Sequence, residues 1–129
     1  MIDHLSIGVG DLKRSRAFYD AALAPLGYRR LFDLVDTSGY GRDEPHPLKE
    51  QALPFWIGHA PGGAALNGHV CFKAPNRAAV KAFHKAALAA GGRDNGKPGL
   101  RADYGPNYYA AFVVDPAGHR LEAYCGAAA

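Results

Sequence analysis

The sequence predicts an α+β protein built from two copies of one β-α-β-β-β unit, and the first observation behind this prediction is internal similarity. Residues 4–27 align with residues 69–92 without a gap, at a constant offset of 65 (69 − 4). In this register His4 matches His69, Phe18 matches Phe83, and Gly27 matches Gly92. The second observation is that each copy passes from strand-like alternation to helix-like spacing. The third is an Asp-Pro-Ala-Gly turn at residues 115–118, between two apolar stretches.

Each unit is predicted to open with a strand that has one apolar face and one more polar face. Over residues 3–9, Leu5, Ile7 and Val9 alternate with His4, Ser6 and Gly8. Over residues 69–74, Val70, Phe72 and Ala74 alternate with His69, Cys71 and Lys73. The histidine lies on the less apolar face in both copies.

A helix is predicted after each of these strands. Asp11 and Asn76 are good N-cap residues, because their side-chain oxygens accept backbone N–H groups of the first turn. Apolar residues then recur near helical spacing. Pro25 and Gly27 end the first helix, and Gly91 with Gly92 ends the second.

Three further strands are predicted in each unit. They cover residues 28–35, 37–40 and 55–59 in the first unit, and 93–96, 108–115 and 119–124 in the second. Residues 41–51 are rich in proline and charge and are predicted to form a surface loop, and residues 60–67 a linker. We expect a single domain over residues 1–126, with module 1 at about 1–60, module 2 at about 66–126, and a frayed tail at 127–129.

Composition excludes several functional classes. The formal net charge of +3 comes from basic residues spread along the 129-residue chain, which argues against nucleic-acid binding. Two cysteines do not form a disulfide framework. The N-terminus lacks the pattern of a signal peptide, and no apolar run is long enough to span a membrane. We therefore expect a cytoplasmic protein with a small-molecule substrate and no membrane partner.

Three ligand-type side chains fall on the less apolar faces of three predicted strands: His4, His69 and Glu122. Two imidazoles and one carboxylate suit a divalent first-row metal with coordination positions left open. A glutamate between apolar neighbours is costly to bury unless it is paired or binds a metal. Each residue has a structural alternative, since either histidine can be scaffolding or a surface group and Glu122 can pair with an arginine. His119 follows the turn and is expected to be exposed, while His84 is expected on the helix surface or in packing.

The sequence resembles the vicinal oxygen chelate superfamily, also described as the glyoxalase, bleomycin-resistance and extradiol dioxygenase superfamily. The resemblance covers nearly the whole chain. The stretches that carry it are Ile2–Val9 with Asp11 and Ser15–Tyr19, Gly68–Phe72, and Phe112–Glu122 with its Asp-Pro-x-Gly-x-x-x-Glu ending. The resemblance implies two β-α-β-β-β modules that form a cupped mixed sheet around one divalent metal ion (Fe, Mn, Ni or Zn). By position, the ligands it implies are His4, His69 and Glu122.

The resemblance also implies a function and an assembly. We expect a glyoxalase-like metal-dependent enzyme (a lyase, isomerase or dioxygenase) that acts on a small oxygenated substrate and forms a homodimer. Lactoylglutathione lyases take a further glutamate ligand from the last strand of module one, where this chain has Trp56 or Ile57, which argues against true glyoxalase I activity. The alternative is a metal-free small-molecule or drug-binding protein of the bleomycin-resistance kind.

Several side chains are candidates to line the cup and bind substrate. The aromatic candidates are Trp56, Tyr109 and Tyr124, although each is also a plausible packing residue. Alternation puts Tyr108 and Tyr109 on opposite faces, so at most one of the two faces the cup. Arg42 and Arg101, in predicted loops, are candidates to meet an anionic substrate. The sequence assigns no catalytic residue.

Overall fold

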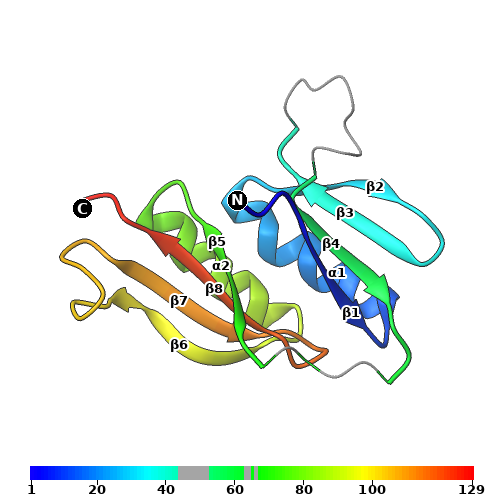
Figure 1. Ribbon diagram of the computed structural model, residues 1–129. Coiled ribbons are helices and arrows are strands. Elements are labelled where there is room, and N and C mark those ends of the chain that lie inside the picture. The colour runs from blue at the N-terminus through cyan, green and yellow to red at the C-terminus, as the bar shows by residue number, and fades with distance from the viewer. Residues whose placement is uncertain (44–52, 63–64, 66) are drawn as a thin grey trace.

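A computed structural model describes residues 1–43, 53–62, 65 and 67–129, and it contains two β-α-β-β-β modules (Figure 1). The first module runs through strand β1 (Leu5–Val9), helix α1 (Leu12–Leu23), the 3-10 turn η1 (Ala24–Leu26), and strands β2 (Arg29–Asp33), β3 (Thr37–Gly41) and β4 (Phe55–His59). The second runs through β5 (His69–Lys73), α2 (Arg77–Ala89), β6 (Arg93–Leu100), β7 (Tyr109–Val114) and β8 (Arg120–Cys125). The predicted α+β class and the duplicated unit are confirmed.

Each module forms its own four-stranded mixed sheet, and the two sheets have the same strand order. The orders are β1-β4-β3-β2 and β5-β8-β7-β6. β1 and β4 pair in parallel, as do β5 and β8, and the other pairs are antiparallel. Among the described strands, β1 and β5 are therefore edge strands, each hydrogen-bonded to one neighbouring strand. The two sheets lie side by side, and each carries its helix on one face (Figure 1).

The helix boundaries follow from the residues predicted to set them. The Asp11 carboxylate accepts a hydrogen bond from the Arg14 amide at 3.0 Å, and the Asn76 side-chain oxygen accepts one from the Ala79 amide at 2.8 Å. Gly27 and Gly91 end the helical segments at φ values of +85° and +97°, which glycine adopts at little cost. The strand β6 extends to Leu100, four residues beyond the predicted end at Gly96 (100 − 96), because paired residues resume after two register shifts.

The core lies between the helices and the helix-facing sides of the two sheets. The largest side chains with no exposed surface come from both modules and include Phe18, Tyr19, Tyr40, Phe83 and Leu121. Tyr19 packs edge-on against Phe18 and lies at a tilt beside Tyr40 and Phe55. The space between each sheet and its own helix is filled, so a functional site has room on the opposite face of a sheet or between the two modules.

Two hydrogen bonds near the Asp115–Gly118 turn join the modules. The Tyr19 hydroxyl on α1 donates to Asp115 Oδ2 at 2.5 Å, and His119 Nε2 lies 2.7 Å from the Gly8 carbonyl oxygen. His119 is only 3% exposed, so the prediction that it is exposed was wrong. The turn packs against the first module at the end of β1, a contact between distant segments that the local turn pattern does not show.

Parts of two predicted connecting segments, in the loop 41–51 and the linker 60–67, lie outside the described residues. Among the helices that the structure describes, none has the length and apolar character needed to cross a membrane.

Candidate metal and substrate site

The face of the second sheet that points away from α2, called the open face below, carries the main cluster of ligand-type side chains. A row of directly paired residues crosses it from β5 to β6: Cys71 opposite Glu122, Glu122 opposite Phe112, and Phe112 opposite Gly96. Alternation along β5 adds His69 to this face, and alternation along β8 adds Tyr124. The open face thus gathers residues from every strand of the sheet.

His69 and Glu122 form the centre of the cluster. His69 Nε2 lies 2.9 Å from Glu122 Oε2, and the hydroxyl of Tyr108 donates to Glu122 Oε1 at 2.6 Å. The Glu122 side chain is 3% exposed, whereas that of His69 is 52% exposed. The buried Glu122 carboxylate has a hydrogen-bond partner on each oxygen and is therefore held in a defined orientation. The His69 imidazole beside it is accessible.

The groups around Glu122 have shifted pKa values. Burial raises the pKa of the Cys71 thiol to about 12, and the negative charge of Glu122 adds to the effect. Burial, followed by the hydrogen bond to Glu122, raises the pKa of Tyr108 well above its ordinary value. Both groups therefore stay protonated near neutral pH, and Tyr108 remains a hydrogen-bond donor toward the carboxylate.

His4 does not join this pair within one chain. It precedes β1, its side chain is 58% exposed, and its Nδ1 lies 2.7 Å from Asp3 Oδ1. Over residues 1–43, 53–62, 65 and 67–129, no three His, Cys, Asp or Glu side chains gather closely enough to hold a metal ion. The structure thus brings together His69 and Glu122, two of the three predicted ligands, and leaves His4 on the other module.

Two of the predicted substrate-binding aromatics lie on faces that point away from the helices. Tyr124 stacks on Tyr108 with a centroid separation of 4.1 Å, beside Glu122. Trp56 lies across from Gly39 on the first sheet, where its ring meets Phe32 at 5.8 Å and its indole N–H donates to the Leu53 carbonyl. Trp56 occupies the sheet face opposite the buried Phe55 and Ile57.

The other two predicted substrate-binding residues lie elsewhere. Tyr109 faces the helix side of its sheet, with the Arg77 guanidinium 5.2 Å from its ring centroid, and Tyr108 takes the place beside Glu122. Alternation indicates that the two tyrosines face opposite ways, but the pattern alone does not say which one faces the site. Arg42 follows β3 and lies over the Tyr28 ring at 5.4 Å.

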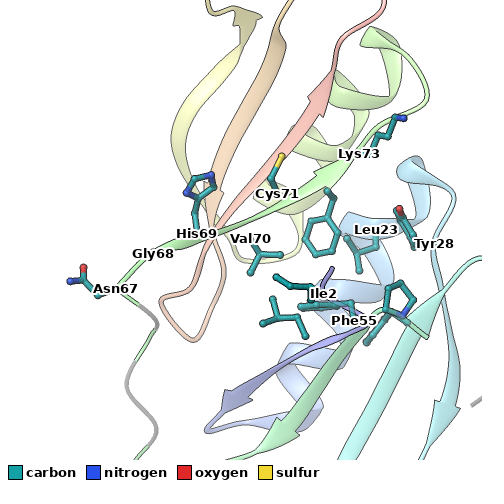
Figure 2. A pocket seen from close by; sticks show the side chains of 14 residues that line it. Ile2, Leu23, Tyr28, Phe55, Asn67, Gly68, His69, Val70, Cys71 and Lys73 are labelled. Carbon is teal, nitrogen blue, oxygen red and sulfur yellow. The ribbon is translucent and has the colours of Figure 1, made fainter. Parts of the chain in front are cut away.

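A separate cavity of about 720 Å³ lies between the modules, on the other side of β5 (Figure 2). Its apolar lining includes Ile2, Leu23, Phe55 and Val70. Figure 2 shows Val70 projecting toward Ile2, whereas His69 and Cys71 project to the opposite side of the strand. Sequence reasoning did not find this cavity, because its walls come from both modules.

Comparisons with known proteins agree with this architecture. The sequence model of the glyoxalase/bleomycin resistance protein/dioxygenase superfamily matches residues 1–123. No curated protein matches the chain. Among solved structures, a glyoxalase/bleomycin resistance protein from Albidiferax ferrireducens T118 is 30% identical, with a TM-score of 0.75 and coverage of 95% of each chain.

More distant structures share the fold. The fosfomycin resistance protein FosX from Listeria monocytogenes is 16% identical over 98% of this chain and 93% of its own, with a TM-score of 0.67. A mutant of that FosX, 15% identical over 98% of this chain and 90% of its own, with a TM-score of 0.67, was solved with Mn(II) and 1S,2S-dihydroxypropylphosphonic acid. The match over nearly the whole sequence shows that the chain belongs to the glyoxalase/bleomycin resistance protein/dioxygenase superfamily.

Proposed function

We propose that the chain is a glyoxalase-like metal-dependent enzyme, a lyase, isomerase or dioxygenase, that acts on a small oxygenated substrate. The observation that carries this proposal is the pairing of Glu122 with His69 on the open face. The Glu122 carboxylate is 3% exposed and lies between apolar neighbours on β8. Burying such a charge costs free energy unless the carboxylate is paired or binds a metal. Superfamily membership supports the same proposal.

The donor atoms present fit a divalent cation. His69 offers an imidazole nitrogen and Glu122 offers carboxylate oxygens, and together with a second imidazole they form a set that suits Fe, Mn, Ni or Zn. A divalent cation there would supply Lewis-acid chemistry, stabilising negative charge on substrate oxygens. Tyr108 would keep the Glu122 carboxylate in place, and Tyr124 would line the substrate side.

A second copy of the chain is the proposed source of the third ligand, His4. Within one chain His4 lies on the first module and makes its contact with Asp3, away from His69 and Glu122. β1 and β5 are edge strands, so each offers an unpaired side to another chain. A homodimer in which the first module of one copy faces the second module of the other would bring His4 to the open face.

Metal analysis tests this proposal. Protein purified without chelator, or reconstituted with Mn²⁺, Fe²⁺, Ni²⁺ or Zn²⁺, should bind one ion per chain. The variants His69→Ala, Glu122→Gln and His4→Ala should each lose most of that binding, because each removes a ligand. His59→Ala, an exposed histidine at the end of β4, is the matched control and should bind metal normally. Unchanged metal content in the three ligand variants would end the proposal.

A second candidate function is metal-free binding of a small molecule or drug, and the apolar cavity between the modules favours it. Its size lies within the range of ordinary ligand pockets. This function predicts tight binding of an aromatic drug that is insensitive to chelator and weakened by Val70→Trp, which would fill the cavity. Binding that requires metal and is lost in Glu122→Gln would instead favour the enzyme.

A further inference from the structure

Arg101 follows β6, and its side chain folds back over the open face. Its Nη2 donates to the Lys97 carbonyl at 2.7 Å, and its Cζ lies 5.4 Å from the centroid of the Phe112 ring. The guanidinium therefore has a defined position on the same face as Glu122, although the sequence shows only an arginine near a predicted loop.

Two glycines of β6 make room for this guanidinium. A Cβ at Gly99 would come within 3.2 Å of Arg101 Nη1. A Cβ at Gly96 would come within 3.3 Å of Arg101 Nη2 and 2.8 Å of the Phe112 ring. Glycine at both positions leaves a shallow trough, and the guanidinium lies in it against the sheet.

The trough lies on the same face of the sheet as the proposed metal site. Phe112 lies beneath the guanidinium and is the direct cross-strand neighbour of Glu122. Adjacent strands are about 4.8 Å apart and β7 separates β6 from β8, so the trough on β6 lies roughly two strand spacings from Glu122. The His69 ring centroid is 6.4 Å from that of Phe112, which places the same aromatic ring between the imidazole and the guanidinium. A small molecule held at His69 and Glu122 and extending toward β6 would meet Arg101.

The charges at this position favour an anion. Among the described residues, no carboxylate forms an ion pair with Arg101, and the one hydrogen bond that its guanidinium makes to a described residue is to the Lys97 carbonyl. A guanidinium has five N–H donors in a planar fork that matches phosphate and carboxylate oxygens. Asp94 on β6 is engaged by His84 and the Gly96 amide, and Glu122 by His69 and Tyr108. These carboxylates are thus directed to other partners.

We propose that Arg101 is the anion-recognising residue of the open face, so that the substrate carries an oxyanion group in addition to the oxygens directed at His69 and Glu122. The substrate part of this inference rests on the proposed function, whereas anion binding at Arg101 does not need a metal. A phosphate, a phosphonate and a carboxylate share the required chemistry, and the experiment below separates phosphate from carboxylate.

The first experiment titrates the ¹⁵N-labelled, metal-free full chain with inorganic phosphate and, separately, with acetate, following arginine Nε–Hε and glycine amide signals by NMR. The Arg101 and Gly99 signals should shift saturably, more strongly with phosphate if the natural group is tetrahedral and with acetate if it is a carboxylate. Arg101→Gln should weaken anion binding at least tenfold. The affinity of Arg101→Lys should lie between those of the wild type and Arg101→Gln, because lysine keeps the positive charge but lacks the planar set of N–H donors. Arg93→Gln, an exposed arginine on the same strand, is the matched control for net charge. Non-saturating shifts, or equal loss in Arg93→Gln, would overturn the proposal.

The second experiment uses Mn²⁺-loaded protein and compares glycerate with 3-phosphoglycerate, which share an α-hydroxycarboxylate and differ by one phosphate. If the first titration favours phosphate over acetate, the wild type should prefer 3-phosphoglycerate at least tenfold, and Arg101→Gln should lose this preference while its Mn²⁺ affinity stays unchanged. If the wild type binds Mn²⁺ but binds glycerate and 3-phosphoglycerate equally well, the idea that the substrate carries a phosphate is contradicted. A chain that binds no Mn²⁺ contradicts the proposed function instead, and the metal-free titration then decides on Arg101 alone.

Discussion

The hydrogen bond from Tyr19 to Asp115 joins two side chains that are both almost fully buried and belong to different modules. Asp115 Oδ1 is already used by the amides of Ala117 and His119, so Oδ2 depends on Tyr19. Tyr19→Phe should lower the free energy of unfolding by about 1–3 kcal/mol, because it leaves a buried carboxylate oxygen without its donor. Urea denaturation measures this difference. Tyr104→Phe, which changes an exposed tyrosine, should have almost no effect, and an equal effect of the two substitutions would contradict the argument.

Tyr108 is expected to act through Glu122. Its hydroxyl fixes Glu122 Oε1 at 2.6 Å, and groups that orient metal ligands typically contribute about 10–100-fold to metal affinity. Tyr108→Phe should therefore weaken Mn²⁺ or Zn²⁺ binding by about tenfold or more while the fold stays intact. Isothermal titration calorimetry measures the affinity, and circular dichroism checks the fold. Metal affinity equal to that of the wild type would show that the Glu122 carboxylate keeps its orientation without this hydrogen bond.

The junction between helix α2 and strand β6 is packed around Gly92. A Cβ at this position would meet a Phe18 ring carbon at 2.8 Å, the Ala87 carbonyl oxygen at 2.9 Å and the Val114 carbonyl oxygen at 3.2 Å. Two of these are backbone atoms, so Gly92→Ala should destabilise the protein by about 1–3 kcal/mol through overpacking. Gly10→Ala is the matched control, since a Cβ there has no neighbour within 4 Å. Thermal denaturation should separate the two variants, and similar midpoints would argue against this packing.

The start of strand β6 is tied to α2 by Asp94 and His84, at 2.8 Å. The hydrogen bond from His84, with help from the Gly96 amide, lowers the pKa of Asp94 below its ordinary value of 3.8. A carboxyl whose pKa is lower when folded adds stability above its unfolded pKa and loses it as the pH falls through the folded pKa. The gap in unfolding free energy between the wild type and Asp94→Asn should therefore be present at pH 7 and shrink below pH 3.8. Denaturation curves across this range measure it, and a gap independent of pH would contradict a stabilising hydrogen bond between His84 and the Asp94 carboxylate.

For the whole molecule, features that repeat along the chain were predictable from the sequence, whereas contacts between modules were not. The match of residues 4–27 with 69–92 predicts both helices and their opening strands, and alternation on β5 and β8 predicts that His69 and Glu122 point away from the helix. The burial of His119 depends on packing against Gly8, which lies 111 residues away. The position of the Arg101 guanidinium over Gly96 and Gly99 depends on its side-chain conformation, which no local sequence pattern predicts.

The separation of His4 from His69 and Glu122 has the largest consequence for the assembly. A repeat places equivalent histidines on equivalent strands, but it does not say whether the two modules of one chain or of two chains face each other. Within the part of the chain that the structure describes, β1 and β5 lie at the edges of two four-stranded sheets. We therefore predict that each metal site is built from two copies of the chain.

Mixing two inactive variants tests this prediction most directly. His4→Ala keeps His69 and Glu122, and Glu122→Ala keeps His4, so neither homodimer should hold metal. After the variants are mixed, unfolded and refolded together, each heterodimer should contain one complete site, with His4 from one chain and His69 and Glu122 from the other. We predict that metal binding measured by elemental analysis reappears at one ion per heterodimer. Mixtures that bind no more metal than the separate variants would contradict a site shared between chains.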